Sequence, residues 1–100
     1  MEADKPDIQI ADVVMSTAGK DRGKLFYCVG TDGVYLYLAN GRERPLDQPK
    51  RKKLKHVNKV LRAETRVAAK IRSGSKVLNS ELRRDLAFLS QTGNSRNQGG

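Results

Sequence analysis

Two closely spaced turn signals, Asp32-Gly33 and Asn40-Gly41, limit the fold of this chain more than any other feature. Each pair suits a two-residue type I′ turn, because Asp, Asn and Gly tolerate the positive φ that both central residues need. The segment between them, Val34–Ala39, alternates aliphatic residues with tyrosines. Such alternation predicts a strand with Tyr35 and Tyr37 on one face and the aliphatic side chains on the other.

Further strands are predicted on both sides of this segment. Ile10–Ser16 and Lys24–Thr31 are rich in β-branched and apolar residues, and a polar loop with a glycine near either end separates them. A fourth strand is expected to begin near Arg42, and a short last strand around Lys53–Val57 is expected to close the sheet. Short strands at this spacing, joined as a meander, predict a small β-barrel.

Beyond the strands, apolar residues recur at spacings of three and four, which is typical of an amphipathic helix. This period predicts a helix from Asn58 or Lys59 to Arg72, with Gly74 as its stop signal. Two short helices of this kind are only marginally stable alone, so we expect them to pack on each other, on the barrel or on a partner.

The second helix is predicted to begin at Asn79 or Ser80 and to end near residue 90. Its apolar stripe consists of Leu82, Leu86 and Leu89. The fold class expected is mainly β with an α tail. Its parts are a mobile lead-in over 1–9, a barrel over 10–57, a helical tail over 58–90 and a disordered, Gly/Asn/Gln-rich end over 91–100.

Positive charge is concentrated in one third of the chain, which carries a net charge of +9 overall. Residues 42–76 hold 13 Lys/Arg against 3 Asp/Glu, whereas residues 1–41 hold 4 against 6. A basic chain can simply be a soluble, positively charged domain, but basic surfaces also attract polyanions, of which nucleic acid is the commonest. The uneven distribution favours a binding surface.

Cys28 is the only cysteine and His56 the only histidine. No internal disulfide can form, and we predict a buried, inert thiol at Cys28. Neither residue has the partners of a catalytic or metal-binding set at suitable spacing, so we expect no enzyme, no metal and no cofactor. No apolar stretch approaches the ~20 residues of a membrane span, and the N-terminus lacks the order of a signal peptide. We therefore expect a cytoplasmic protein without a membrane partner.

The segment Ala11–Val29 follows a specific order of residues. A strand containing Asp12–Val14 leads through the loop Gly19–Lys24 into a second apolar strand. This order resembles the KOW motif of ribosomal and transcription-factor proteins, which runs from a Gly-Asp-x-Val strand through a Gly-Lys-x-x-Gly-Lys loop. Ala11 stands where that family usually has glycine, which implies a slightly different entry into the first strand.

Two more stretches, Asn40–His56 and Asn79–Leu86, resemble a subgroup of short bacterial KOW proteins. These are similar to the archaeal and eukaryotic fourteen-e class of large-subunit ribosomal protein. The resemblance implies an SH3-like barrel, binding of ribosomal RNA, a role in translation or ribosome assembly, and a monomer off the ribosome. KOW barrels also bind proteins, so a module that contacts polymerase or ribosomal proteins stays open, as does non-specific DNA binding.

The candidate RNA-binding residues lie in the KOW-like loop and in the basic third of the chain. The loop can be only a polar hairpin, and the run Lys50–Lys55 can be a solvated cluster or a nuclear-import signal. Repulsion within that run, together with the resemblance, favours phosphate contact. Tyr35 and Tyr37 can stack on bases, but we favour a role in covering the barrel or the helices. The RNA-binding set is Lys20, Arg22, Gly23, Lys24, Arg42, Arg44, Lys50, Arg51, Lys52, Lys53, Lys55 and His56.

Overall fold

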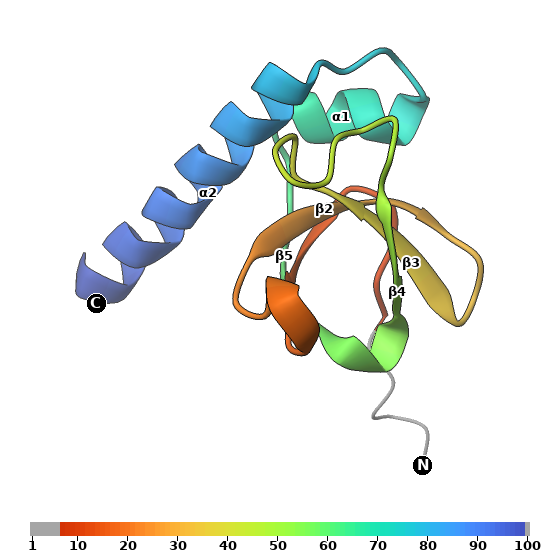
Figure 1. Cartoon of the computed structure of the whole chain (residues 1–100). Coiled ribbons are helices and arrows are strands. Elements are labelled where there is room, and N and C mark those ends of the chain that lie inside the picture. The colour runs from red at the N-terminus through yellow and green to blue at the C-terminus, as the bar shows by residue number, and fades with distance from the viewer. Residues whose placement is uncertain (1–6, 100) are drawn as a thin grey trace.

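The computed structural model describes residues 7–99 of the chain as a curved sheet with two helices (Figure 1). The strands are β1 (Asp12–Ser16), β2 (Leu25–Thr31), β3 (Tyr35–Ala39), β4 (Lys50–Lys53) and β5 (Val57–Arg62). Two 3₁₀ turns, η2 (Gly19–Asp21) and η3 (Leu54–His56), follow β1 and β4, and the helices are α1 (Arg66–Ser73) and α2 (Asn79–Gly99).

The five strands form one antiparallel sheet in the order β4-β3-β2-β1-β5. β4 and β5 are its edges, and no backbone pairing joins them within the part of the chain that the structure describes. η3 connects these two edge strands directly, so they approach each other at one end of the sheet. The predicted β-rich unit followed by two helices is therefore confirmed, but the sheet is not closed by hydrogen bonds.

The alternation along the strands divides the apolar residues into two cores. The inner face of the sheet buries Val14, Phe26 and Leu36 together with Ile8, Cys28, Leu38 and Val57. The outer face of β1 and β2 carries Val13 and Tyr27, which pack against the helices. Neighbours in sequence such as Phe26 and Tyr27 thus enter different cores, as expected for a strand covered on both sides.

The prediction of a helix over 58–72 is wrong in its first half, where the structure has strand β5. Val57–Arg62 pairs along the whole of β1, and only Val57 among these residues is fully buried. Without this pairing β1 would be an open edge with unpaired backbone N–H and C=O groups. The spacing of apolar residues within 58–72 gives no information about that distant partner. The sheet therefore extends to Arg62 rather than ending at residue 57.

Helix α1 begins later than predicted and ends where predicted. The Thr65 hydroxyl accepts a hydrogen bond of 3.1 Å from the Ala68 amide, which is a standard N-cap arrangement. Gly74 ends the helix with a φ of 77°, and its amide donates to the Ile71 carbonyl. Local capping chemistry thus sets both ends of α1.

The two predicted type I′ turns are also absent, because Ala11 is the only residue other than glycine with positive φ among those described. The Asn40 side chain instead organises a longer loop by accepting hydrogen bonds from the amides of Arg42 and Arg44, at 3.0 and 3.1 Å. The fourth strand consequently begins at Lys50 rather than near Arg42. Asx-type bonds of this kind replace the backbone turn.

Both ends of the chain differ from the prediction. The expected mobile lead-in covers 1–9, of which 1–6 lie outside the described residues, and Ile8 is buried in the inner core. α2 continues to Gly99, past the end predicted near residue 90 and through the segment predicted to be disordered. Extending an existing helix needs no new nucleus, which favours continuation over a fresh start.

The helices dock on the sheet through one polar cluster and one apolar stripe. The Tyr27 hydroxyl of β2 donates to Asp85 of α2 and lies 3.2 Å from the Thr65 hydroxyl at the start of α1. Leu82 and Leu86 are buried in the outer core, as the predicted stripe requires. The side-chain oxygen of Asn79, in the first turn of α2, also accepts a 2.8 Å hydrogen bond from the Leu46 amide.

Gly41 lies where the loop after β3 meets the start of α2. Its φ is 79°, and a Cβ at this position would collide with the Asn79 carbonyl oxygen and press on the Arg83 side chain. The Arg83 guanidinium donates a 2.8 Å bond to the Gly41 carbonyl. Any side chain at residue 41 would therefore push α2 away from the sheet.

We expect Gly41→Ala to lower the free energy of unfolding by more than about 2 kcal/mol. The strain of a left-handed backbone at alanine adds to the cost of the collision between the new Cβ and the Asn79 carbonyl oxygen. Gly33→Ala is the matched control, since Gly33 has a φ of 94° and open space around it. It should lower stability by only about 1 kcal/mol through strain. Urea unfolding followed by circular dichroism measures both, and equal losses would contradict the close approach at residue 41.

Candidate nucleic-acid interface

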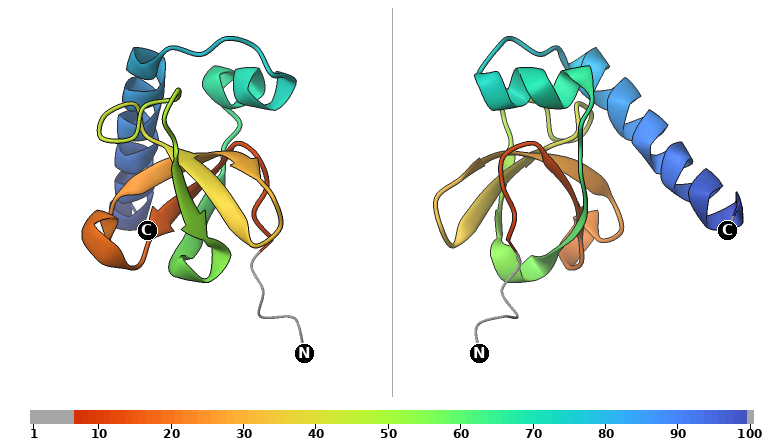
Figure 2. Two further views of the ribbon diagram at one scale, coloured as in Figure 1. Left: turned by 45° about the vertical axis from the view of Figure 1, so that its right-hand side comes forward. Right: turned by 180° about the vertical axis from the view of Figure 1, so that it is seen from behind.

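The KOW-like loop and the end of the basic run lie next to each other at one end of the sheet. The Lys52 amine donates a 2.9 Å bond to the Ala18 carbonyl, and the Thr17 amide donates a 2.9 Å bond to the His56 carbonyl. Figure 2 shows from two sides that η2 and η3 both lie at the end of the sheet opposite α1. Two segments that are more than thirty residues apart in sequence thus form one surface.

We call this surface the basic end. Its members are the cations Lys20, Arg22, Lys52, Lys53 and Lys55 of the η2 loop and the β4–η3 junction, together with the imidazole of His56. Lys20, Arg22, Lys53 and Lys55 are exposed, whereas Lys52 and His56 are half-buried. Gly23 follows Arg22, and nothing lies within 4 Å of where its Cβ would be, but its amide donates a 2.8 Å bond to the Ser16 carbonyl. The four exposed cations on these two adjacent segments can neutralise several phosphates of a polyanion.

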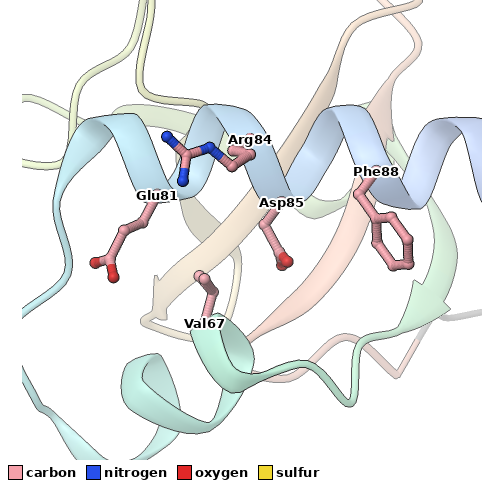
Figure 3. Close-up of a pocket in the computed structure, with 5 residues that line it drawn as sticks. All are labelled: Val67, Glu81, Arg84, Asp85 and Phe88. Carbon is pink, nitrogen blue, oxygen red and sulfur yellow. The ribbon is translucent and has the colours of Figure 1, made fainter.

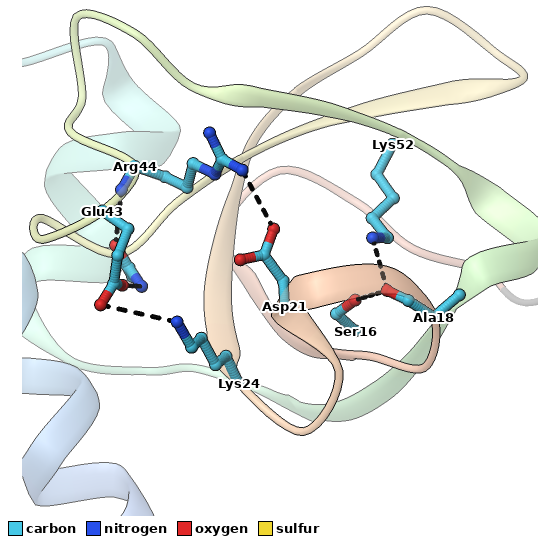
Figure 4. A network of polar contacts seen from close by, with 8 residues as sticks. Ser16, Ala18, Asp21, Lys24, Glu43, Arg44 and Lys52 are labelled. Carbon is cyan, nitrogen blue, oxygen red and sulfur yellow. Dashed lines mark hydrogen bonds and ion pairs between the residues drawn. The ribbon is translucent and has the colours of Figure 1, made fainter.

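Besides Lys52, whose amine binds Ala18, two of the predicted RNA-binding residues form ion pairs within the chain (Figure 4). The Arg44 guanidinium lies 3.3 Å from the carboxylate of Asp21, whose side chain is only 7% exposed. The Lys24 amine lies 3.6 Å from the Glu43 carboxylate. A hydrogen bond from Asn40, followed by smaller contributions including Lys24, lowers the pKa of Glu43 and keeps it charged. These pairs hold the loop after β3 against η2, and Arg42 stays exposed on that loop.

The basic run divides between the two faces of the sheet. Lys50 and Lys52 lie opposite Leu38 and Leu36 and point to the inner face. Both are half-buried, and the Lys52 amine is held by the Ala18 carbonyl described above. Arg51 and Lys53 lie opposite Tyr37 and Tyr35 on the outer face and are exposed. Of the five cations in the run, the three at residues 51, 53 and 55 are therefore exposed, and the other two point to the inner face.

Tyr35 and Tyr37 share the outer face of β3, as the alternation predicted. The Arg51 guanidinium lies 3.8 Å from the centroid of the Tyr35 ring, and the Tyr37 hydroxyl donates a 3.0 Å bond to Asp32. That hydrogen bond is the main reason the pKa of Tyr37 is raised. We call Tyr35, Tyr37, Arg51 and Lys53 the tyrosine face. The apolar cluster under the helices takes Ala39 from β3 and neither tyrosine, so the covering role does not extend to the helices.

Two residues that shape the tyrosine face were not in the predicted site. Gly30 of β2 lies opposite Tyr37, and a Cβ there would be 3.5 Å from the ring. Asp32 binds the Tyr37 hydroxyl and also accepts a 3.1 Å bond from the Tyr35 amide. An isolated glycine inside a strand often marks a close approach, so Gly30 carried a usable signal, whereas Asp32 indicated only a turn.

A groove of about 350 Å³ lies between the helices, lined by Val67 of α1 and by Glu81, Arg84, Asp85 and Phe88 of α2 (Figure 3). Its carboxylates are already used to hold the structure together. Asp85 accepts from Tyr27 and Thr65, and Glu81 lies 2.9 Å from the Lys70 amine. Both carboxylates of the groove are thus held by other side chains of this chain.

The single cysteine is buried on the inner face. Burial is the main reason that the pKa of the Cys28 thiol is raised, to about 11, so the thiolate form is rare at neutral pH. Within the part of the chain that is described, no cluster of three or more His, Cys, Asp or Glu side chains could hold a metal ion. No helix among the described residues combines the length and apolar character that crossing a membrane requires.

A scan against protein-family models finds no match, and neither does a search of the curated proteins. The function must therefore be inferred from the geometry and charge of the chain itself.

We expect Lys52→Met to lower the free energy of unfolding by about 1 kcal/mol, because it removes the amine that binds the Ala18 carbonyl. Lys53→Met, at the next residue on the opposite face, is the matched control and should change stability by less than about 0.5 kcal/mol. Thermal and urea unfolding measure both variants. A larger loss from Lys53→Met would contradict the assignment of the two faces.

Proposed function

We propose that the chain is a non-catalytic RNA-binding protein that binds ribosomal RNA as a ribosomal or ribosome-associated protein. The observation that carries the proposal is the basic end, where contacts at Ala18 and His56 bring η2 beside η3. Exposed cations from both segments then lie at the same end of the sheet. The carboxylate nearest in sequence, Asp21, is buried and already paired with Arg44. Such a surface attracts phosphate without needing a specific base.

The backbone at the start of β1 also supports the KOW resemblance. Ala11 has a φ of 75°, in the left-handed region that favours glycine, and glycine is the residue that the KOW motif usually has there. The next residue, Asp12, is fully buried and accepts a 2.8 Å bond from the Gln9 amide. The curved sheet is, in this proposal, an SH3-like barrel of the KOW type whose loop after β1 meets RNA.

The phosphate contacts in this proposal are made by a subset of the predicted residues. Lys20 and Arg22 bind from the η2 side, and Lys53 and Lys55 bind from the η3 side. Arg44 and Lys52 position these segments through their contacts with Asp21 and Ala18 rather than reaching RNA themselves. Binding by such mobile cations should fall steeply as salt rises.

The test neutralises three exposed cations of the basic end in one variant, Lys20→Ala/Arg22→Ala/Lys55→Ala. Filter binding to a folded ribosomal RNA fragment is measured over a range of salt concentrations. The slope of log K against log salt is negative. We expect its magnitude to fall by about 2 in this variant, because each lost phosphate contact removes roughly 0.7–0.9. Duplex DNA as competitor shows whether binding is general for polyanions.

The charge-matched control is Arg66→Ala/Lys76→Ala/Arg84→Ala, which removes three exposed cations from the helical part. It lowers the net charge by the same amount and should leave the slope nearly unchanged. Equal losses from both variants would mean that net charge alone drives binding. The absence of RNA binding at any salt concentration would overturn the proposal, and ribosome or polymerase association that survives the first variant would favour the protein-interaction module.

A further inference from the structure

The tyrosine face is built across three strands, and both of its tyrosines are half-buried. Gly30 of β2, Tyr37 of β3 and Arg51 of β4 lie opposite one another in register. Two residues earlier in β3, Tyr35 lies opposite Lys53. Because Gly30 has no side chain, nothing from β2 stands over the Tyr37 ring at this point. Two aromatic rings and two cations are therefore presented side by side on the outer face.

The rings are held in place by the chain itself. The bond to Asp32 fixes the Tyr37 hydroxyl, and the Arg51 guanidinium carbon lies over the Tyr35 ring, 3.8 Å from its centroid. Side chains that are already ordered lose little freedom when a ligand binds, so such a surface is preorganised. Arginine stacked on tyrosine also offers a second planar group to a flat ligand.

The surroundings of the tyrosine face select an anionic ligand. Arg51 and Lys53 are exposed on it, and Lys53 is followed directly by η3, which carries Lys55 of the basic end. A chain that lies along the basic end can therefore continue past Lys53 and Arg51 onto the tyrosines. The carboxylate beside them, Asp32, is hydrogen-bonded to the Tyr37 hydroxyl and the Tyr35 amide. Aromatic rings bordered by such cations match bases joined by phosphates.

We propose that the tyrosine face binds an unpaired segment of RNA by stacking of its bases on Tyr37 and on the Arg51–Tyr35 pair. This inference deepens the proposed RNA binding and rests on it. Bases within a duplex are stacked on each other and cannot lie on a protein ring, so the bound segment is a loop, bulge or single-stranded end. The basic end binds the backbone, and the tyrosine face requires that the bases be free.

The experiment compares two single-stranded RNAs of equal length, an oligoadenylate and an abasic oligoribonucleotide, bound to the full chain and followed by fluorescence anisotropy. Both have the same number of phosphates, but only the oligoadenylate has bases that can stack on the tyrosines. We expect Tyr37→Ala to weaken oligoadenylate binding by about tenfold or more and to leave abasic binding unchanged. Tyr37→Phe keeps the ring and should stay within about twofold of the wild type.

Phe88→Ala is the matched control, because it removes an exposed ring from α2 rather than from the sheet. It should bind both oligonucleotides like the wild type. Tyr35→Ala, at the first residue of β3, allows the same comparison if circular dichroism shows that Tyr37→Ala does not fold.

The outcomes separate this inference from the proposed function. If the tyrosine variants change oligoadenylate and abasic binding equally, or change neither, base stacking is overturned while phosphate-driven RNA binding stands. If the wild type binds neither oligonucleotide nor folded RNA at low salt, both proposals fail. A folded RNA that competes only when it contains an unpaired loop would support the inference.

Discussion

The Tyr27 hydroxyl is the point at which the sheet and both helices meet. It comes from the middle of β2 and contacts Thr65, the N-cap of α1, and Asp85 of α2. Burial, followed by the bond to Asp85, raises the pKa of Tyr27, so the hydroxyl remains protonated and able to donate. Because the helices are anchored here, they cover the outer face near β1 and β2. Tyr35 and Tyr37 lie outside the apolar cluster under the helices, and both are half-buried.

The arrangement of charge follows from this anchoring. The helices pack at one end and on one side, while η2 and η3 carry the cations at the other end. Repulsion within the basic end opposes folding, and two hydrogen bonds, at Ala18 and at His56, hold the segments together against it. A bound polyanion would relieve that repulsion. In the proposed function, RNA binding and stability are coupled through these same residues.

Local pattern was a good guide wherever a strand or helix was specified by its own residues. The alternation over Val34–Ala39 correctly put Tyr35 and Tyr37 on one face, and Gly74 correctly ended α1. The pattern failed over Val57–Arg62, where the spacing of apolar residues suits a helix and the available partner β1 makes it a strand. It failed again at Asn40, where side-chain bonds to the following amides produced a long loop instead of a tight turn.

The residue pattern alone predicts short antiparallel strands followed by a helical tail. It also places the excess of positive charge between residues 42 and 76, with further cations in the loop around Lys20. Packing of the chain then sets which cations are used internally: Arg44 pairs with Asp21 and Lys52 binds Ala18, and contacts at Ala18 and His56 bring the η2 loop beside the β4–η3 junction. The reason is physical. Contacts between residues far apart in the chain depend on strand register and on how edges meet, and neither is set by the order of residues within a single element.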